Sequence, residues 1–152
     1  MNLWNETKSV PVSREQVWSA YKKVKANKGG AGVDEVSMEE FDANRSKQLY
    51  KLWNRMASGS YFPPPVKEVE IKKKDGGKRK LGIPTILDRI AQEVVRAYLD
   101  KFVEPKFHKS SYGYRKGRSQ HQAVREATKQ ALQYKWAIDL DIKGYFDTID
   151  HK

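Results

Sequence analysis

The stretch AIDLDIKGYFDTIDHK, residues 137–152, carries the pattern that decides the fold class. Apolar and acidic side chains alternate in it, as Ile138, Asp139, Leu140 and Asp141. This alternation predicts a strand that buries one apolar face and carries two carboxylates on the other. A pair of carboxylates at a strand end suits Mg²⁺, which binds one or two carboxylates together with substrate phosphates. A strand that runs into a turn with solvated aspartates would show the same pattern.

The chain is strongly basic. Its 152 residues include 30 lysines and arginines against 19 aspartates and glutamates, a net charge of +11 and a pI near 9.7. Such a surface attracts polyanions, of which nucleic acid is the commonest. No bilayer-spanning apolar run or secretory leader is recognised, so no membrane partner is expected. The lack of cysteine excludes disulfides and cysteine-ligated zinc and is typical of a cytoplasmic protein.

Helical periodicity predicts four helices, over residues 14–26, 38–59, 85–104 and 120–133. Three of them begin at capping boxes, in which a serine and a glutamine or glutamate three residues later satisfy each other's backbone amides. These pairs are Ser13 with Gln16, Ser37 with Glu40, and Ser119 with Gln122. Together with a short hairpin, the separated helices predict an α+β fold.

A β-hairpin is predicted over residues 66–83, with Gly76 and Gly77 in its turn. Six cations crowd the tip, namely Lys72, Lys73, Lys74, Lys78, Arg79 and Lys80. Because like charges repel, this cluster predicts that an anion such as a triphosphate binds there. The alternative is an exposed hairpin with solvated lysines.

A second basic segment, SYGYRKGRSQH, precedes the last predicted helix. Arg115 and Arg118 lie close to a helix N-terminus, where backbone N–H groups already favour phosphate. Tyr112 and Tyr114 add aromatic faces on which bases stack. A plain connector in front of a capped helix is the alternative interpretation.

In this order, four segments resemble the N-terminal part of reverse transcriptases encoded by bacterial group II introns. NKGGAGVD at 27–34 is similar to the loop of that family's N-terminal extension, and DGGKRKLGIPTILDRIAQ at 75–92 to its first fingers motif. SYGYRKGRSQHQA at 111–123 is similar to the second fingers motif. AIDLDIKGYFDTIDH at 137–151 is similar to the palm motif that carries the first catalytic aspartate.

The resemblance implies a right-hand polymerase fold in three parts. These are a helical N-terminal extension over 1–60, fingers over 61–134 and the start of a palm over 135–152. It implies RNA-directed DNA synthesis with two Mg²⁺ or Mn²⁺ ions. The family's further carboxylates lie in an aromatic-x-Asp-Asp turn that the sequence lacks, so we expect a fragment that is inactive alone. The truncated strand at 135–141 should expose an unpaired edge and an apolar face, and we expect self-association through it or disorder of the last residues.

The resemblance also implies roles for individual residues. Asp141 and the backbone carbonyl of Ile142 match metal ligands of the palm. Phe146 matches the residue under the incoming sugar, where its ring leaves no room for a 2′-hydroxyl. Nucleotide contacts are implied for Lys73, Arg79 and Arg115. Nucleic-acid contacts are expected for Lys28, Lys72, Lys74, Lys78, Tyr112, Tyr114 and Arg118.

The implied partners are an RNA template such as the intron RNA, a DNA primer and deoxynucleoside triphosphates. A non-catalytic RNA-binding module that acts in intron splicing, as a maturase does, is an alternative. A small basic protein of the ribosomal type is a third, but it would have no use for an acidic strand end beside a bulky aromatic residue.

Overall fold

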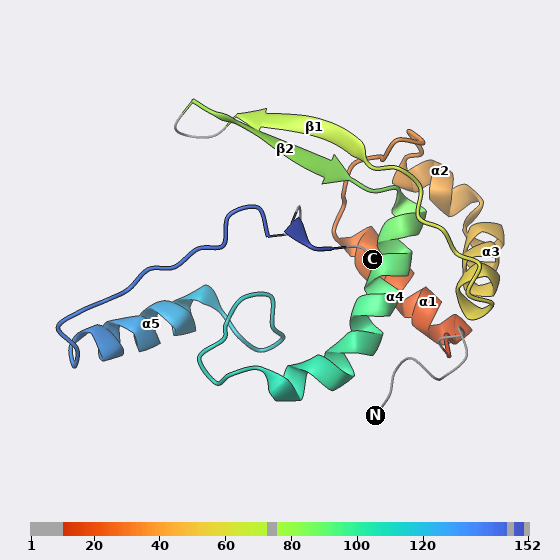
Figure 1. The fold of residues 1–152 in the computed structure, drawn as a ribbon. Helices are drawn as coiled ribbons and strands as arrows, with labels where there is room; N and C mark the ends of the chain where they lie inside the picture. The colour runs from red at the N-terminus through yellow and green to blue at the C-terminus, as the bar shows by residue number, and fades with distance from the viewer. Residues whose placement is uncertain (1–10, 73–75, 146–147, 151–152) are drawn as a thin grey trace. The chain divides into compact units, whose positions relative to one another are not determined.

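The computed structural model describes residues 11–72, 76–145 and 148–150. Lys73, Lys74 and Phe146, three of the predicted site residues, lie outside these ranges. Two compact units divide the chain, Met1–Phe102 and Val103–Lys152. The elements in chain order are α1 (Arg14–Ala26), α2 (Met38–Ala43), α3 (Arg45–Ala57), β1 (Lys67–Lys72), β2 (Lys78–Ile83), α4 (Ile86–Val103), a 3₁₀ helix (Glu104–Lys106) and α5 (Gln120–Ala131) (Figure 1). Helices with one small sheet agree with the predicted α+β class.

The first unit contains a core between its four helices. Eleven apolar residues are buried there: Val17, Ala20, Tyr21, Val24, Phe41, Leu49, Leu52, Ile86, Ile90, Ala91 and Val94. On α1 and α4 they recur every three or four residues, which places them on one face of each helix. The segment before α1 is tied to α3, because the indole N–H of Trp53 donates to the carbonyl of Val12 at 2.9 Å.

The predicted capping boxes are all present, and they fix where three helices begin. Helix α1 has the predicted bounds, and α5 ends two residues earlier than expected. The single helix expected over 38–59 is wrong, because Asn44, with φ −116° and ψ 16°, separates α2 from α3. Phe41 and Leu49 are eight residues apart, a spacing that also fits one continuous helix, so periodicity alone could not reveal the break.

The hairpin is confirmed as an antiparallel pair in which Lys67 lies opposite Ile83 and Lys72 opposite Lys78. Successive side chains in a strand point to opposite faces. One face therefore carries the charged residues Glu68, Glu70, Lys72, Lys78 and Lys80. The other carries Val69, Ile71, Arg79 and Leu81, all of which are exposed.

The second unit has no strand among its described residues, so the strand predicted over 135–141 is wrong. Trp136, Ile138 and Leu140 are 85–88% exposed, which agrees with the exposed apolar face expected of a truncated strand and not with a face buried in a complete sheet. A strand forms only when a neighbouring strand pairs with its backbone amides and carbonyls. The described part of this unit supplies no such neighbour, so the alternating pattern stays irregular.

Candidate nucleic-acid interface

The charged face of the hairpin is partly neutralised by its own acids. Lys78 pairs with Glu70 at 2.7 Å, and Lys80 pairs with Glu68 at 2.9 Å. The expectation of six mutually repelling cations is therefore wrong for these two, because the register brings acids of β1 beside them. All four side chains are exposed, and such surface pairs contribute little, so a phosphate could replace the carboxylates at small cost.

Arg79 lies on the opposite face of the hairpin from Lys78 and Lys80. Among the described residues its side chain forms no hydrogen bond or ion pair, and its neighbours on this face are the exposed apolar side chains of Ile71 and Leu81. This face therefore offers a guanidinium beside apolar surface. The predicted site residues of the hairpin are divided between two faces rather than gathered in one cluster.

The Gly-rich loop over 27–36 lies against the junction between β2 and α4. A Cβ atom at Gly32 would be 2.7 Å from the backbone nitrogen and Cα of Thr85, so only glycine fits there. Lys28 is exposed and has a left-handed φ of 47°. The sequence alone gave no reason to connect this loop with the start of α4.

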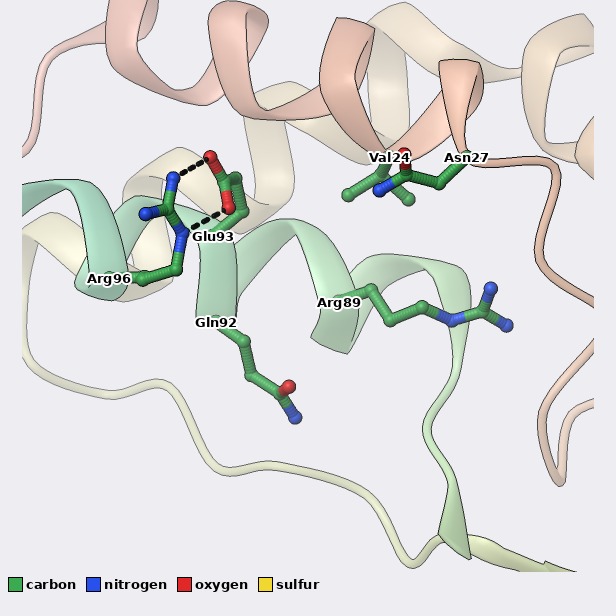
Figure 2. A pocket seen from close by; sticks show the side chains of 6 residues that line it. All are labelled: Val24, Asn27, Arg89, Gln92, Glu93 and Arg96. Carbon is green, nitrogen blue, oxygen red and sulfur yellow. Dashed lines mark hydrogen bonds and ion pairs between the residues drawn. The ribbon is translucent and has the colours of Figure 1, made fainter. Parts of the chain in front are cut away.

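Between α1 and α4 lies a cavity of about 420 Å³, lined by Val24, Asn27, Arg89, Gln92, Glu93 and Arg96 (Figure 2). Glu93 accepts hydrogen bonds from Arg96 at 2.7 and 2.8 Å and from Lys23 at 2.9 Å. These bonds, with that to Arg96 the strongest, lower the pKa of the Glu93 carboxyl to about 2. This carboxylate thus joins α1 to α4, a role that its position in the sequence did not indicate.

A second carboxylate, Asp88, is buried in the first turn of α4. It accepts hydrogen bonds from the Tyr61 hydroxyl and the Gln92 side-chain amide, both at 2.8 Å. Its own backbone N–H donates to the Thr85 hydroxyl at 3.2 Å. Burial and the bond to Asp88 raise the pKa of the Tyr61 hydroxyl. Asp88 therefore holds the segment before β1 against α4 and is not open to a ligand.

In the second unit, Arg115 organises the loop that follows the 3₁₀ helix. Its side chain is 8% exposed and pairs with Glu104 at 2.7 Å. The guanidinium also donates to the carbonyls of His108 at 3.0 Å and Ser111 at 2.8 Å, and it lies 4.9 Å from the centre of the Phe107 ring. Most of its donors are thus already bonded within the loop.

The same loop brings together two predicted nucleic-acid contacts. The Arg118 guanidinium lies 5.3 Å from the centre of the Tyr112 ring, a favourable cation–π distance. Tyr114 has a left-handed φ of 55°, and its side chain is fully exposed. An exposed ring of this kind is a suitable surface for base stacking.

The predicted metal ligands lie on the exposed segment after α5. Asp141 and Ile142 offer a carboxylate and a backbone carbonyl, the oxygen donors that Mg²⁺ and Mn²⁺ accept, and Asp139 lies on the same segment without a predicted bond to the metal. Within the ranges that the structure describes, no three acidic or histidine side chains are grouped to hold a metal ion. These residues therefore fit one part of a two-metal site and do not complete it.

The described helices also include none long and apolar enough to cross a membrane.

Comparison with known proteins gives several relatives. The group II intron-encoded protein LtrA of Lactococcus lactis subsp. cremoris is 37% identical over 133 residues, which is 87% of this chain and 22% of that protein. Protein YkfC of Escherichia coli (strain K12) is 36% identical over 126 residues, 80% of this chain and 33% of that protein.

The putative COX1/OXI3 intron 1 protein of Saccharomyces cerevisiae is 31% identical over 150 residues, 99% of this chain and 18% of that protein. The chain therefore spans a third or less of the length of these relatives. These similarities confirm the resemblance to group II intron-encoded proteins that the motifs indicated. Residues 71–152, more than half of the chain, match the model of the reverse transcriptase (RNA-dependent DNA polymerase) family, and the chain therefore belongs to this family.

Proposed function

We propose that the chain forms the N-terminal extension, the fingers and the start of the palm of a group II intron-type reverse transcriptase. The parts are residues 1–60, 61–134 and 135–152. The observation that carries the proposal is the hairpin of the first fingers motif, in which Arg79 has no partner among the described residues and lies beside exposed apolar side chains. A planar guanidinium in this setting suits a phosphate group.

In this proposal the complete enzyme copies an RNA template, such as intron RNA, from a DNA primer. Asp141 and the carbonyl of Ile142 would hold part of a pair of Mg²⁺ or Mn²⁺ ions, which supply charge stabilisation to the attacking and leaving oxygens. Phe146 would select deoxynucleotides, and Lys73 and Arg79 would bind the triphosphate. The remaining carboxylates would have to come from residues outside this sequence.

Arg115 enters the proposal in a different way. Because its guanidinium is bonded to Glu104 and to two backbone carbonyls, we propose that it shapes the loop beside the nucleotide. Arg118, Tyr112 and Tyr114 would then contact the nucleic acid from this loop. On the hairpin and the Gly-rich loop, phosphate contacts are proposed for Lys28, Lys72, Lys74 and Lys78.

Binding of RNA by this chain is the first test. Each phosphate neutralised on a single strand should contribute a slope of about −0.7 to a plot of log affinity against log salt. We expect a slope equivalent to several phosphates, measured by fluorescence anisotropy with a single-stranded RNA. An affinity that does not change with salt would contradict the proposed interface.

Catalysis is tested separately. In a full-length protein that contains this sequence, Asp141→Asn should abolish primer extension with Mg²⁺ and deoxynucleotides while RNA binding is kept. The 152-residue chain by itself should give no extension. Sustained synthesis by the Asp141→Asn protein would refute the assignment of Asp141, and synthesis by the 152-residue chain would refute the need for further carboxylates.

A splicing role without catalysis is the second candidate. Its support is that the relatives include nuclear intron maturase 1 of Arabidopsis thaliana, 31% identical over 67 residues, 44% of this chain. Under this alternative, Asp141→Asn in the full-length protein would leave its function unchanged. Primer extension by the full-length protein, measured with and without the substitution, distinguishes the two candidates, because only the first predicts synthesis that depends on Asp141.

A further inference from the structure

Arg89 joins the β2–α4 junction to a loop that lies 59 positions away in the sequence. It lies in the first turn of α4, and its Nε donates to the carbonyl of Pro84 at 3.0 Å. Its Nη2 donates to the carbonyl of Gly30, in the loop that follows α1. Figure 2 shows the Arg89 side chain extending away from Glu93 and Arg96, which bind each other on the same helix. One guanidinium therefore fixes the Gly-rich loop to the end of β2.

The glycines of this loop give independent evidence that it packs closely against the β2–α4 junction. On one side, Gly32 is so close to the backbone of Thr85 that a Cβ atom would overlap it. On the other, a Cβ atom at Gly30 would meet nothing within 4 Å. The loop thus has an inner side in contact with the β2–α4 junction and an open outer side. Lys28 belongs to the exposed part.

The side-chain chemistry explains why arginine is needed at position 89. A guanidinium is planar and offers donors in two directions, so it can bond two carbonyls at once. A lysine ammonium is a compact point charge on a flexible stem, and it would hold one of the carbonyls at a time. A lysine at position 89 would therefore keep the positive charge but lose one of the two hydrogen bonds.

We propose that Arg89 is a positioning residue for nucleic-acid binding. It holds the loop over 27–36 in a fixed position against the base of the hairpin, so that Lys28 and the hairpin cations meet the phosphates of one bound strand together. This inference rests on the proposed function of the chain as a nucleic-acid-binding polymerase part. The inference adds that Arg89 acts by positioning the two basic segments relative to each other and not through its own charge.

The test compares two substitutions that keep the charge. Arg89→Lys should weaken binding of a single-stranded RNA about tenfold, the size expected when one charge-assisted hydrogen bond is lost. Arg96→Lys lies two turns further along the same helix and does not contact the loop, so it should change the affinity less than about twofold. Amide exchange should become faster across residues 29–34 in Arg89→Lys and stay unchanged in α1.

A second pair of variants tests the position of the loop without replacing any basic residue. Gly32→Ala should displace the loop and weaken RNA binding to a similar degree as Arg89→Lys. Gly30→Ala, where the added methyl group meets open space, should have a smaller effect. This pair keeps the proposal testable even if Arg89→Lys lowers the stability of the whole unit.

The outcomes separate the inference from the proposed function. If wild type binds RNA in a salt-dependent way but Arg89→Lys and Gly32→Ala bind as tightly, positioning by Arg89 is wrong and the proposed interface stands. Equal losses in Arg89→Lys and Arg96→Lys would also overturn it, because a general effect on α4 would then be the cause. If wild type does not bind RNA, the proposed function fails and this inference fails with it.

Discussion

The two compact units of the chain use their apolar residues in opposite ways. In the first unit, four helices bury eleven apolar side chains against one another. In the second, none of the described residues is buried, although Ile138 and Leu140 belong to a regular apolar pattern. Periodicity therefore identifies which face of a segment is apolar. Burial needs a partner element, and the pattern of one segment does not reveal whether the partner is present.

The largest expected effect of a single substitution follows from this comparison. Leu52 is 0% exposed, and Leu52→Ala should lower the free energy of unfolding by about 3 kcal/mol, through lost burial and the cavity left behind. Leu140 is 88% exposed, and the same chemical change there should cost less than about 0.5 kcal/mol. Urea denaturation followed by circular dichroism measures both. An equal loss of unfolding free energy in the two variants would show that Leu140 is buried against other residues in solution.

The next prediction concerns the exposed segment after α5. Trp136, Ile138 and Leu140 present apolar side chains to solvent, and such a patch promotes association. Light scattering should give a mass above that of a monomer, rising with concentration. Replacing all three residues with serine should restore the monomer. A monomeric wild type with slow amide exchange across residues 136–141 would contradict this prediction.

Local signals in the sequence predicted much of the fold. The capping boxes fixed the starts of α1, α2 and α5, and the Gly-containing turn predicted the hairpin. The break at Asn44 was missed, because the apolar spacing continues across it. The strand at 135–141 was predicted but is not formed, because its alternating pattern has no neighbouring strand among the described residues.

The candidate site could be predicted in composition but not in arrangement. The sequence indicated the basic hairpin, yet strand register decides that Glu68 and Glu70 neutralise Lys80 and Lys78 while Arg79 lies on the other face. The contact of Arg89 with the Gly30 carbonyl joins residues 59 positions apart, so no local pattern reports it. Whether the predicted metal and nucleotide residues act as proposed stays a prediction for the experiments above.

A smaller effect is expected from the ion pairs that join α1 to α4 in the first unit. Because Arg96 and Lys23 lower the pKa of Glu93 to about 2, its carboxylate stabilises the fold above the ordinary carboxyl pKa, near 4.5. This contribution is lost as the pH falls from 4.5 toward 2. Glu93→Gln should therefore cost about 1–2 kcal/mol at pH 7, after allowance for the exposed partners, and progressively less toward pH 2.

Thermal melts of wild type and Glu93→Gln at several pH values measure this difference. Glu70→Gln is a suitable control, because the ion pair that Glu70 forms with Lys78 on the hairpin is exposed. Its effect should be less than about 0.5 kcal/mol at any pH. A constant cost of Glu93→Gln from pH 7 to pH 2 would mean that the amide disturbs packing rather than removing a charge.

The smallest expected change in overall stability belongs to Arg115, although its local effect should be clear. The Arg115 side chain is 8% exposed, and its bonds to Glu104, His108 and Ser111 are the main polar contacts that order this loop. Arg115→Lys keeps the charge but cannot reproduce three sets of hydrogen bonds. We expect a change of less than about 1 kcal/mol in overall stability, with faster amide exchange across residues 107–115.

Acid should have the same local effect as this substitution. Arg115 lowers the pKa of the Glu104 carboxyl, so the contact is complete above the usual carboxyl range and is lost as the pH falls through the lowered pKa. Arg125→Lys, at an exposed position of α5, is the matched control and should leave the loop unchanged. If Arg115→Lys also leaves amide exchange in the loop unchanged, the loop owes its conformation to the backbone. The Arg115 guanidinium would then be available to a nucleotide, as the resemblance to the second fingers motif implies.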